Sequence, residues 1–239
     1  IHYPLSTIHY PLATNHYPLA TQMKIVAAKK ILKANDQQAA EIRSQLDAAG
    51  VFGVNLVGSP GAGKTTLLEA LFAKLKGRVK PAVIEGDIAG TIDAVRMEEI
   101  GVPVVQINTD GACHLDANMI ASSIDGLDLS SVDMLVIENV GNLVCTAGYD
   151  LGERLRIVVL STSEGDDKAH KYPAIFQGSQ AMFITKTDLL PYTKFDVERI
   201  TADYKRLAPN GEVFLVSAVG GEGIAEAADW LETRCNKPR

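Results

Sequence analysis

The stretch GSPGAGKT at residues 58–65 decides the fold, because it matches the phosphate-loop pattern G-x-x-x-x-G-K-[ST]. The apolar run FGVNLVG (52–58) precedes it, and TTLLEALFAKL follows with the pattern of a helix. A strand, a glycine-rich loop and a helix in this order present backbone N–H groups to phosphate oxygens. We expect the nucleotide phosphates to contact Gly58, Ser59, Pro60, Gly61, Ala62, Gly63, Lys64, Thr65 and Thr66.

Six further apolar runs follow the first one, and helical stretches separate them. They lie at 81–87, 102–107, 132–138, 155–160, 181–185 and 212–217. Strands that are apolar throughout are typical of a parallel sheet covered on both faces. The sequence therefore predicts a doubly wound α/β P-loop fold with about seven strands, whose ligands bind beyond the carboxyl ends of the strands.

Two acidic residues close predicted strands at that edge. Asp87 ends the run 81–87, and Glu138 ends the run 132–138. With the Thr65 hydroxyl they form a predicted Mg²⁺ shell, while Lys64 reaches the β- and γ-phosphates. The amide of Gly141, in the segment ENVG, can sense the γ-phosphate. No side chain stands out as a strong general base, so we expect slow hydrolysis.

The base specificity follows from TKTD at 185–188, which is similar to the guanine-reading N-K-x-D pattern. A carboxylate at Asp188 accepts hydrogen bonds from the N1–H and 2-amino groups of guanine, a donor pair that adenine lacks. The stem of Lys186 can lie against the purine, and Thr185 replaces the usual asparagine, which we expect to weaken the bracing of the loop. The Ala218 amide, beside Ser217, is a candidate partner for the guanine oxygen. GTP is therefore the expected substrate.

A cysteine and a histidine are adjacent in DGACHLDANM (110–119). Cys113 and His114 precede a predicted helix whose N-terminus would favour the thiolate. Cys145 lies four residues beyond Gly141. Two thiolates and an imidazole suit Zn²⁺ or Ni²⁺, and a water, a carboxylate or a second subunit can complete the site. The alternative is that Cys113 and His114 are ordinary packing residues; Cys235 is expected to be a surface thiol.

The composition bounds the class of protein. The chain has 239 residues, a formal net charge of −6 and three cysteines. No basic block predicts nucleic-acid binding, and no apolar run approaches the roughly 20 residues that cross a bilayer. Three cysteines are too few for a disulfide framework, and the N-terminus lacks a secretory pattern. We expect a cytoplasmic protein with no nucleic-acid or membrane partner.

The sequence divides into a tail (1–22) and a body (23–239). The tail repeats IHYPLST, IHYPLAT and NHYPLAT, and a proline in each unit favours an extended chain. Its three histidines suggest weak metal collection, or else the repeat merely lies upstream of the true start at Met23. The body opens with a helical segment, 23–50, in one or two pieces, ahead of the GTPase domain.

Several motifs together resemble the HypB family. They are GSPGAGKTTLLE, EGDIAGTIDA, CHLDA, ENVGNLVC, KYP and TKTDLLP, in this order. The resemblance implies a SIMIBI-class GTPase that dimerises and delivers nickel to [NiFe]-hydrogenase precursors with the accessory protein HypA. It also implies that Gly58–Thr65 binds phosphates, that Cys113, His114 and Cys145 bind the transported metal, and that Asp87 and Glu138 bind magnesium.

The sequence departs from the family pattern at three points. The CxxCGC nickel motif that many members carry is missing, DGACH stands for GKGCH, and Thr146 stands for the proline after the second cysteine. Three other functions stay open: a UreG-type urease nickel GTPase, a P-loop small-molecule kinase or ligase, and a regulatory GTPase without metal delivery.

Overall fold

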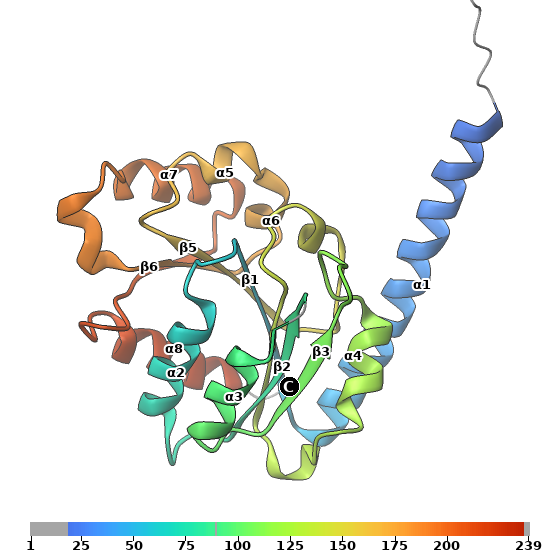
Figure 1. Ribbon diagram of the computed structural model, residues 1–239, viewed down its shortest axis with the longest axis horizontal. Coiled ribbons are helices and arrows are strands. Elements are labelled where there is room, and N and C mark those ends of the chain that lie inside the picture. The colour runs from blue at the N-terminus through green and yellow to red at the C-terminus, as the bar shows by residue number, and fades with distance from the viewer. Residues whose placement is uncertain (1–18, 89, 237–239) are drawn as a thin grey trace, which may run out of the picture.

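The computed structural model describes residues 19–88 and 90–236, and the tail residues 1–18 lie outside them. One sheet of seven parallel strands, in the order β3-β2-β4-β1-β5-β6-β7, carries helices on both faces (Figure 1). The doubly wound α/β fold predicted from the apolar runs is confirmed. The order places the strand that leads into the phosphate loop at the centre of the sheet.

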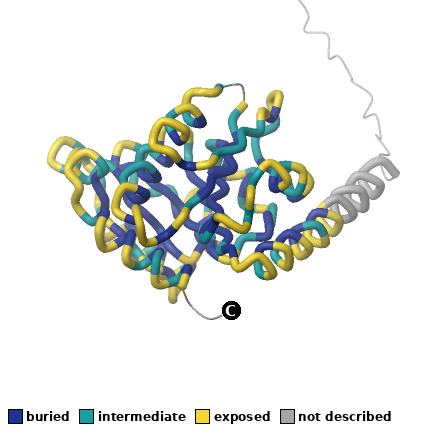
Figure 2. The backbone as a smooth tube through the Cα atoms, turned by 90° about the horizontal axis from the view of Figure 1, so that it is seen from below, coloured by how far each residue is buried: buried dark blue, intermediate teal, exposed yellow. Residues whose placement is uncertain are grey.

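The strands follow the apolar runs closely. They are β1 (Phe52–Gly58), β2 (Pro81–Asp87), β3 (Val104–Asn108), β4 (Met134–Glu138), β5 (Leu155–Ser161), β6 (Ala181–Thr185) and β7 (Glu212–Leu215). The inner strands are buried on both faces (Figure 2), which is why they are apolar throughout. Strands β3, β4 and β7 differ from the predicted runs by two residues at one end, and β3 also extends one residue further, to Asn108.

The helices form two layers. One face carries α2 (Lys64–Leu75), α3 (Ile92–Glu99) and α8 (Ile224–Cys235), and the other carries α1 (Leu19–Ala49), α4 (Ala117–Ile124), α5 (Lys168–Lys171), α6 (Pro173–Gln177) and α7 (Val197–Leu207). Three 3₁₀ segments complete the described chain: η1 (Leu129–Ser131), η2 (Cys145–Gly148) and η3 (Thr187–Tyr192). No helix among the described residues is long and apolar enough to cross a membrane.

Two expectations from the sequence need correction. Helix α1 is one piece and begins at Leu19, so residues 19–22 are helical rather than extended. Pro18 directly precedes this helix, where a missing N–H costs nothing, and no proline follows until Pro60. Cys235 is not a surface thiol: it ends α8, is only 6 % exposed and donates from Sγ to the Asp133 carbonyl at 3.4 Å.

Candidate functional site

The phosphate loop turns between β1 and α2 in a geometry that requires glycine. A Cβ on Gly58 would lie 2.6 Å from the carbonyl oxygen of Val159 on β5. Gly61 and Gly63 have φ values of 73° and 86°, in the left-handed region that favours glycine. Lys64 opens α2 and is buried, as is the residue after it. Close packing and backbone conformation thus fix a loop whose N–H groups can turn toward an anion.

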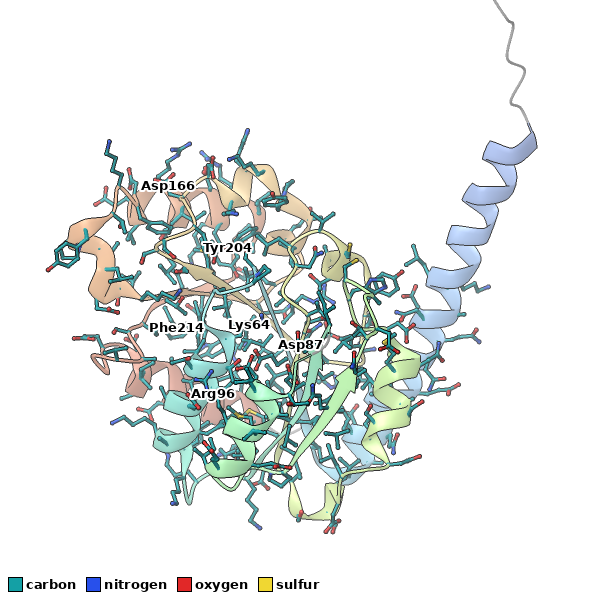
Figure 3. The ribbon with its side chains drawn as sticks, viewed as in Figure 1. Lys64, Asp87, Arg96, Asp166, Tyr204 and Phe214 are labelled. Carbon is teal, nitrogen blue, oxygen red and sulfur yellow. The ribbon has the colours of Figure 1, made fainter. Side chains whose placement is uncertain are left out.

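An all-oxygen cluster lies beside this loop. The Thr65 hydroxyl donates to Oε1 of Glu138 at 2.8 Å, and Oε2 of Glu138 has no hydrogen-bond partner among the described residues. Glu85 pairs with Glu138 in the register of β2 and β4, and its Oε2 is also buried without a partner there. Asp87, labelled with Lys64 in Figure 3, ends β2 and accepts from the N–H groups of Ile88 and Gly90, both at 2.7 Å. Unpartnered carboxylate oxygens of this kind fit a magnesium ion.

Burial changes the protonation of two of these carboxyl groups. It raises the pKa of Glu85 to about 8, with help from the nearby charges of Glu138 and Asp87. It also raises the pKa of Glu138 to about 7, although the Lys64 ammonium and the Thr65 hydroxyl oppose the shift. Without a cation the cluster therefore retains protons near neutral pH.

This protonation predicts the pH dependence of stability. In the metal-free, nucleotide-free protein, the free energy of unfolding should fall as the pH rises from about 5 to about 8. Both pKa values lie above the ordinary 4.5, so the folded chain binds more protons than the unfolded chain in this window. Glu85→Gln should make this fall in the free energy of unfolding smaller by more than about 1 kcal/mol. Urea unfolding at about pH 5 and about pH 8 measures the difference.

The exposed Glu99 provides the control for this experiment. Glu99→Gln should leave the pH dependence of the wild type unchanged. If Glu85→Gln also leaves it unchanged, the protonated carboxyl group is not at Glu85.

Arg96 holds α3 against the phosphate-loop helix. Its guanidinium donates to the Thr66 hydroxyl at 2.8 Å and to both carboxylate oxygens of Glu69, at 2.9 and 2.5 Å. It also pairs with Asp93 on its own helix. Since α3 follows the loop that begins after Asp87, these bonds fix the segment next to the predicted magnesium ligands.

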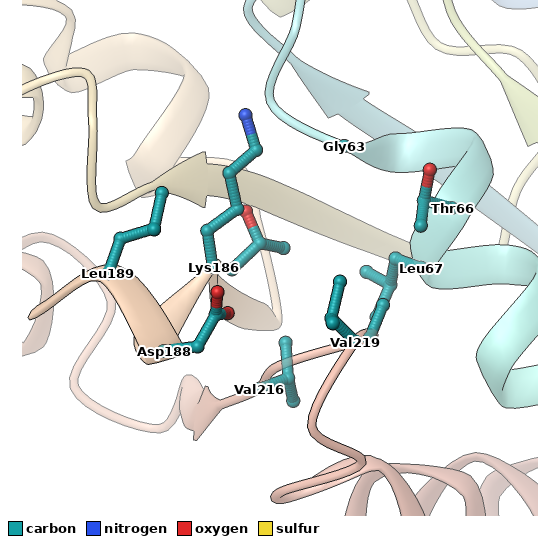
Figure 4. A pocket seen from close by; sticks show the side chains of 10 residues that line it. Gly63, Thr66, Leu67, Lys186, Asp188, Leu189, Val216 and Val219 are labelled. Carbon is teal, nitrogen blue, oxygen red and sulfur yellow. The ribbon is translucent and has the colours of Figure 1, made fainter.

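A cavity of about 260 Å³ lies on the other side of the phosphate loop (Figure 4). It is lined by Gly63, Thr66, Leu67, Thr185, Lys186, Asp188, Leu189, Val216, Ala218 and Val219. Lys186 has a φ of 58° and donates from Nζ to the carbonyl of Gly61 at 2.7 Å. The Thr185 hydroxyl donates to the carbonyl of Ala62 at 2.6 Å. Thr185 therefore braces the phosphate loop through this bond; that it does so more weakly than asparagine stays a prediction.

Asp188 is the one carboxylate that lines this cavity among the described residues. The Ser217 hydroxyl donates to its Oδ1 at 2.7 Å and accepts from the N–H of Gly220 at 2.9 Å. Ser217 thereby fixes the carboxylate, and Ala218 lines the cavity beside it. The structure thus brings the five residues predicted for base recognition to one place.

The second candidate site contains the two cysteines and the histidine. Cys113 and His114 lie in the loop between β3 and α4, and Cys145 begins η2 after β4. One donor atom from each of the three half-buried residues lies within 4.8 Å of the other two. Cys113 Sγ is 3.7 Å from His114 Nδ1. A hydrogen bond with the Cys113 thiol raises the pKa of Cys145 above its ordinary value. The chemistry of these donors fits Ni²⁺ or Zn²⁺.

Asn142 connects this cluster to the phosphate loop. Its N–H donates to the carbonyl of Gly58 at 2.9 Å, and its Oδ1 accepts from the N–H groups of Val144 and Cys145 at 2.7 and 2.9 Å. Just before it, Gly141 packs so closely that an added Cβ would lie 2.8 Å from the backbone of Pro60. The loop with Cys145 therefore lies directly on the phosphate loop.

The N–H groups at the N-terminus of α4 bond to side chains close to the cluster. Helix α4 begins at Ala117, and the Asp116 side chain accepts from the N–H of Met119 at 2.9 Å. The N–H of Ala117 donates to Oδ1 of Asn35 at 2.9 Å. Since side chains bind these helix-terminal N–H groups, the Cys113 thiol does not.

The comparisons with known proteins agree with these features. The model of the CobW/HypB/UreG nucleotide-binding domain matches residues 52–215. The chain is 47 % identical over 206 residues to hydrogenase maturation factor HypB of Escherichia coli K12, covering 86 % of this chain and 71 % of that protein. It is 49 % identical over 203 residues to HypB of Azotobacter vinelandii, covering 84 % and 67 %.

The chain belongs to the HypB family. The crystal structure of HypB from Helicobacter pylori in complex with nickel aligns with a TM-score of 0.81 and 39 % identity, over 84 % of this chain and 95 % of that chain. The family resemblance drawn from the motifs is thereby confirmed. HypB proteins are hydrogenase maturation factors, so a nickel-related role in maturation follows at the level of the family.

Several residues of this HypB-family site were missed by sequence reasoning. The position of Glu85 could have been predicted, because it lies two residues before Asp87 in the same strand and therefore on the same face of the sheet. Tyr149, whose ring stacks on His114 at 4.0 Å between centroids, carried no signal in the sequence. Asn35 and Arg96 also carried none, because the contacts of both residues reach other helices or loops.

Proposed function

We propose that this chain is a GTP-hydrolysing metallochaperone that assists nickel insertion into [NiFe]-hydrogenase. Its cargo is Ni²⁺, with Zn²⁺ as a competing ion, bound by Cys113, His114 and Cys145. The strongest support is that two thiols and an imidazole lie together within 4.8 Å, and that the loop of one of them, Cys145, is bonded to the phosphate loop. Such donors suit Ni²⁺ and Zn²⁺ and are unsuited to Mg²⁺. Membership of the HypB family supports hydrogenase as the destination.

The substrate GTP is assigned to the phosphate loop and the cavity beside it. Backbone N–H groups and Lys64 hold the phosphates, and Asp188 selects guanine. Thr65, Asp87 and Glu138 would hold Mg²⁺, which supplies charge neutralisation for the phosphate oxygens. None of these residues is a strong general base, so intrinsic hydrolysis should be slow.

The link between nucleotide and metal is assigned to Gly141 and Asn142. In this proposal the Gly141 amide contacts the γ-phosphate, and the order that this contact imposes passes through Asn142 to Cys145. Loss of the γ-phosphate loosens the same loop and releases the metal. The structural basis is the close packing of Gly141 on Pro60 and the bonds of Asn142 to Gly58 and Cys145.

The number of metal-binding donor atoms suggests that the site is completed from outside these three residues. Three donors are one fewer than the usual four, so a water, a carboxylate or the same site of a second subunit completes the shell. A nucleotide- and metal-dependent homodimer is the arrangement that we propose. The other partners are a HypA-type accessory protein and the hydrogenase large-subunit precursor, in the cytoplasm.

Equilibrium dialysis with Ni²⁺ and Zn²⁺ tests the proposal. We expect metal affinity to be about tenfold higher with a non-hydrolysable GTP analogue than with GDP, which is a typical coupling between two sites. Gly141→Ala should still bind nickel with GDP but should lose this difference, because its Cβ forces the loop away from Pro60. Gly148→Ala is the matched control, since an added Cβ there meets nothing within 4 Å.

Two results would decide against the proposal. Equal metal affinity with both nucleotides would remove the switch. No metal binding at all would leave a regulatory GTPase. A urease-directed carrier of the UreG type would bind the same ions, and nickel transfer to apo-hydrogenase or to apo-urease distinguishes the two.

A further inference from the structure

A buried asparagine on α1 joins the two loops that carry the thiols and the imidazole. Asn35 is 3 % exposed. Its Oδ1 accepts from the N–H of Ala117 at 2.9 Å, and its Nδ2 donates to the carbonyl of Asp150 at 2.8 Å. Ala117 lies three residues after His114, and Asp150 lies five residues after Cys145. One side chain thus bonds to the backbone of both loops.

These bonds close a ring of contacts around the histidine. Along one route, Asn35 holds the start of α4, from which the chain leads directly back to His114. Along the other, it holds Asp150, whose neighbour Tyr149 stacks on the His114 ring at 4.0 Å. Asn35 therefore connects two segments that lead to His114, although it contributes no donor atom to the cluster.

Two neighbouring residues of α1 contact the segment after Cys145. Arg43 forms bonds from Nη2 to both carboxylate oxygens of Asp150, at 2.7 and 2.8 Å. Ile42 packs against Gly152, where an added Cβ would lie 2.6 Å from its Cγ2. These contacts lie at residues 150 and 152, beyond Tyr149, and neither Arg43 nor Ile42 has a hydrogen bond to the Cys113–His114 loop among the described contacts.

We propose that Asn35 is a positioning residue for the nickel site and that its two hydrogen bonds set the separation of the loops carrying the donors. The inference rests on the proposed role of Cys113, His114 and Cys145. It adds that α1, which provides none of the donors, controls their geometry. Replacing a residue that orients the ligands of a metal typically lowers the affinity of the site for that metal by about 10- to 100-fold.

Nickel titration of the full chain tests this inference, with Ni²⁺ alone as the probe and a chromophoric chelator as competitor. Asn35→Leu removes both bonds at similar volume and should lower nickel affinity at least about tenfold. It should also shift the thiolate-to-nickel absorption band, because the donors meet the ion in a changed geometry. Affinity for a fluorescent guanine nucleotide should stay at the wild-type level, since Asn35 contacts none of the phosphate-loop residues.

Two further variants separate positioning from general stability. Asn35→Asp keeps the acceptor for Ala117 and loses the donor to Asp150, so nickel affinity should fall although α4 keeps its N-terminal bond. Ile42→Ala leaves a cavity where the same helix packs on the core, and it should destabilise the fold. It should nevertheless leave the nickel affinity and the absorption band unchanged.

The outcomes are distinct. If both Asn35 variants bind nickel as the wild type does, or if Ile42→Ala loses affinity as they do, the positioning role is overturned while the proposed function stands. If the wild type itself binds no nickel, the proposed function fails and the inference fails with it. Loss confined to the Asn35 variants, together with a shifted band, supports the inference.

Discussion

Cys113→Ala is expected to lower the affinity for Ni²⁺ by at least about 100-fold while leaving guanine-nucleotide binding intact. The change removes one of three donors that lie within 4.8 Å of one another. Each thiolate bond to nickel or zinc contributes several kcal/mol, so the remaining thiol and imidazole hold the ion only weakly. Nickel binding is measured by chelator competition, and nucleotide binding by the fluorescence of a labelled GDP.

Cys235→Ala is the matched control for this experiment, because Cys235 is the third cysteine and lies in α8, outside the cluster. It should bind nickel with wild-type affinity. Unchanged nickel affinity in Cys113→Ala would show that the ion binds elsewhere, and the metallochaperone proposal would then lose its site.

Asp188→Asn is expected to lower GTP affinity by at least about 100-fold and to raise affinity for xanthosine triphosphate. The carboxylate is the one acidic side chain that lines the cavity among the described residues, and Ser217 already donates to its Oδ1. In the variant, an amide N–H group would face the 2-amino group of guanine. Two donors then face each other without an acceptor, which strongly disfavours guanine binding. Xanthine has an oxygen at that position and accepts from the amide.

The measurement is competition of GTP, ATP and xanthosine triphosphate against a labelled guanine nucleotide. Ser217→Ala serves as a control, since it removes the hydroxyl that fixes Asp188 but keeps the carboxylate, and GTP affinity should fall only several-fold. If the wild type binds ATP with the same affinity as GTP, Asp188 does not select the base.

The fold could be predicted because its determinants are local in the sequence. The phosphate-loop pattern and the apolar runs placed the strand from Phe52 to Gly58 and the strand from Ala181 to Thr185 at the residues where the structure has them. The limits of α1 could not be predicted in the same way. Residues 19–21 are the end of the third proline-containing repeat, and the repeat pattern obscured the helix that begins after the last proline.

The candidate sites were predictable only where a motif carries them. Cys113 and Cys145 were chosen for their residue type and their place after expected strands, and the structure brings them together with His114. Asn35 could not be chosen, because an asparagine within a helical stretch has no distinctive pattern, and its two partners lie 82 and 115 residues away. Contacts of this range depend on how α1 packs on α4 and on the loop after η2.

The short path through Asn142 has a kinetic consequence. This residue bonds directly to the first residue of the phosphate loop and to the backbone of a sulfur donor. Between loss of the γ-phosphate and release of the metal, the proposed switch requires no rotation of domains and no rearrangement of a long chain of side chains. Under the proposed function, loss of inorganic phosphate and release of the metal are therefore expected to proceed at the same rate, so that GTP turnover would time the release of nickel.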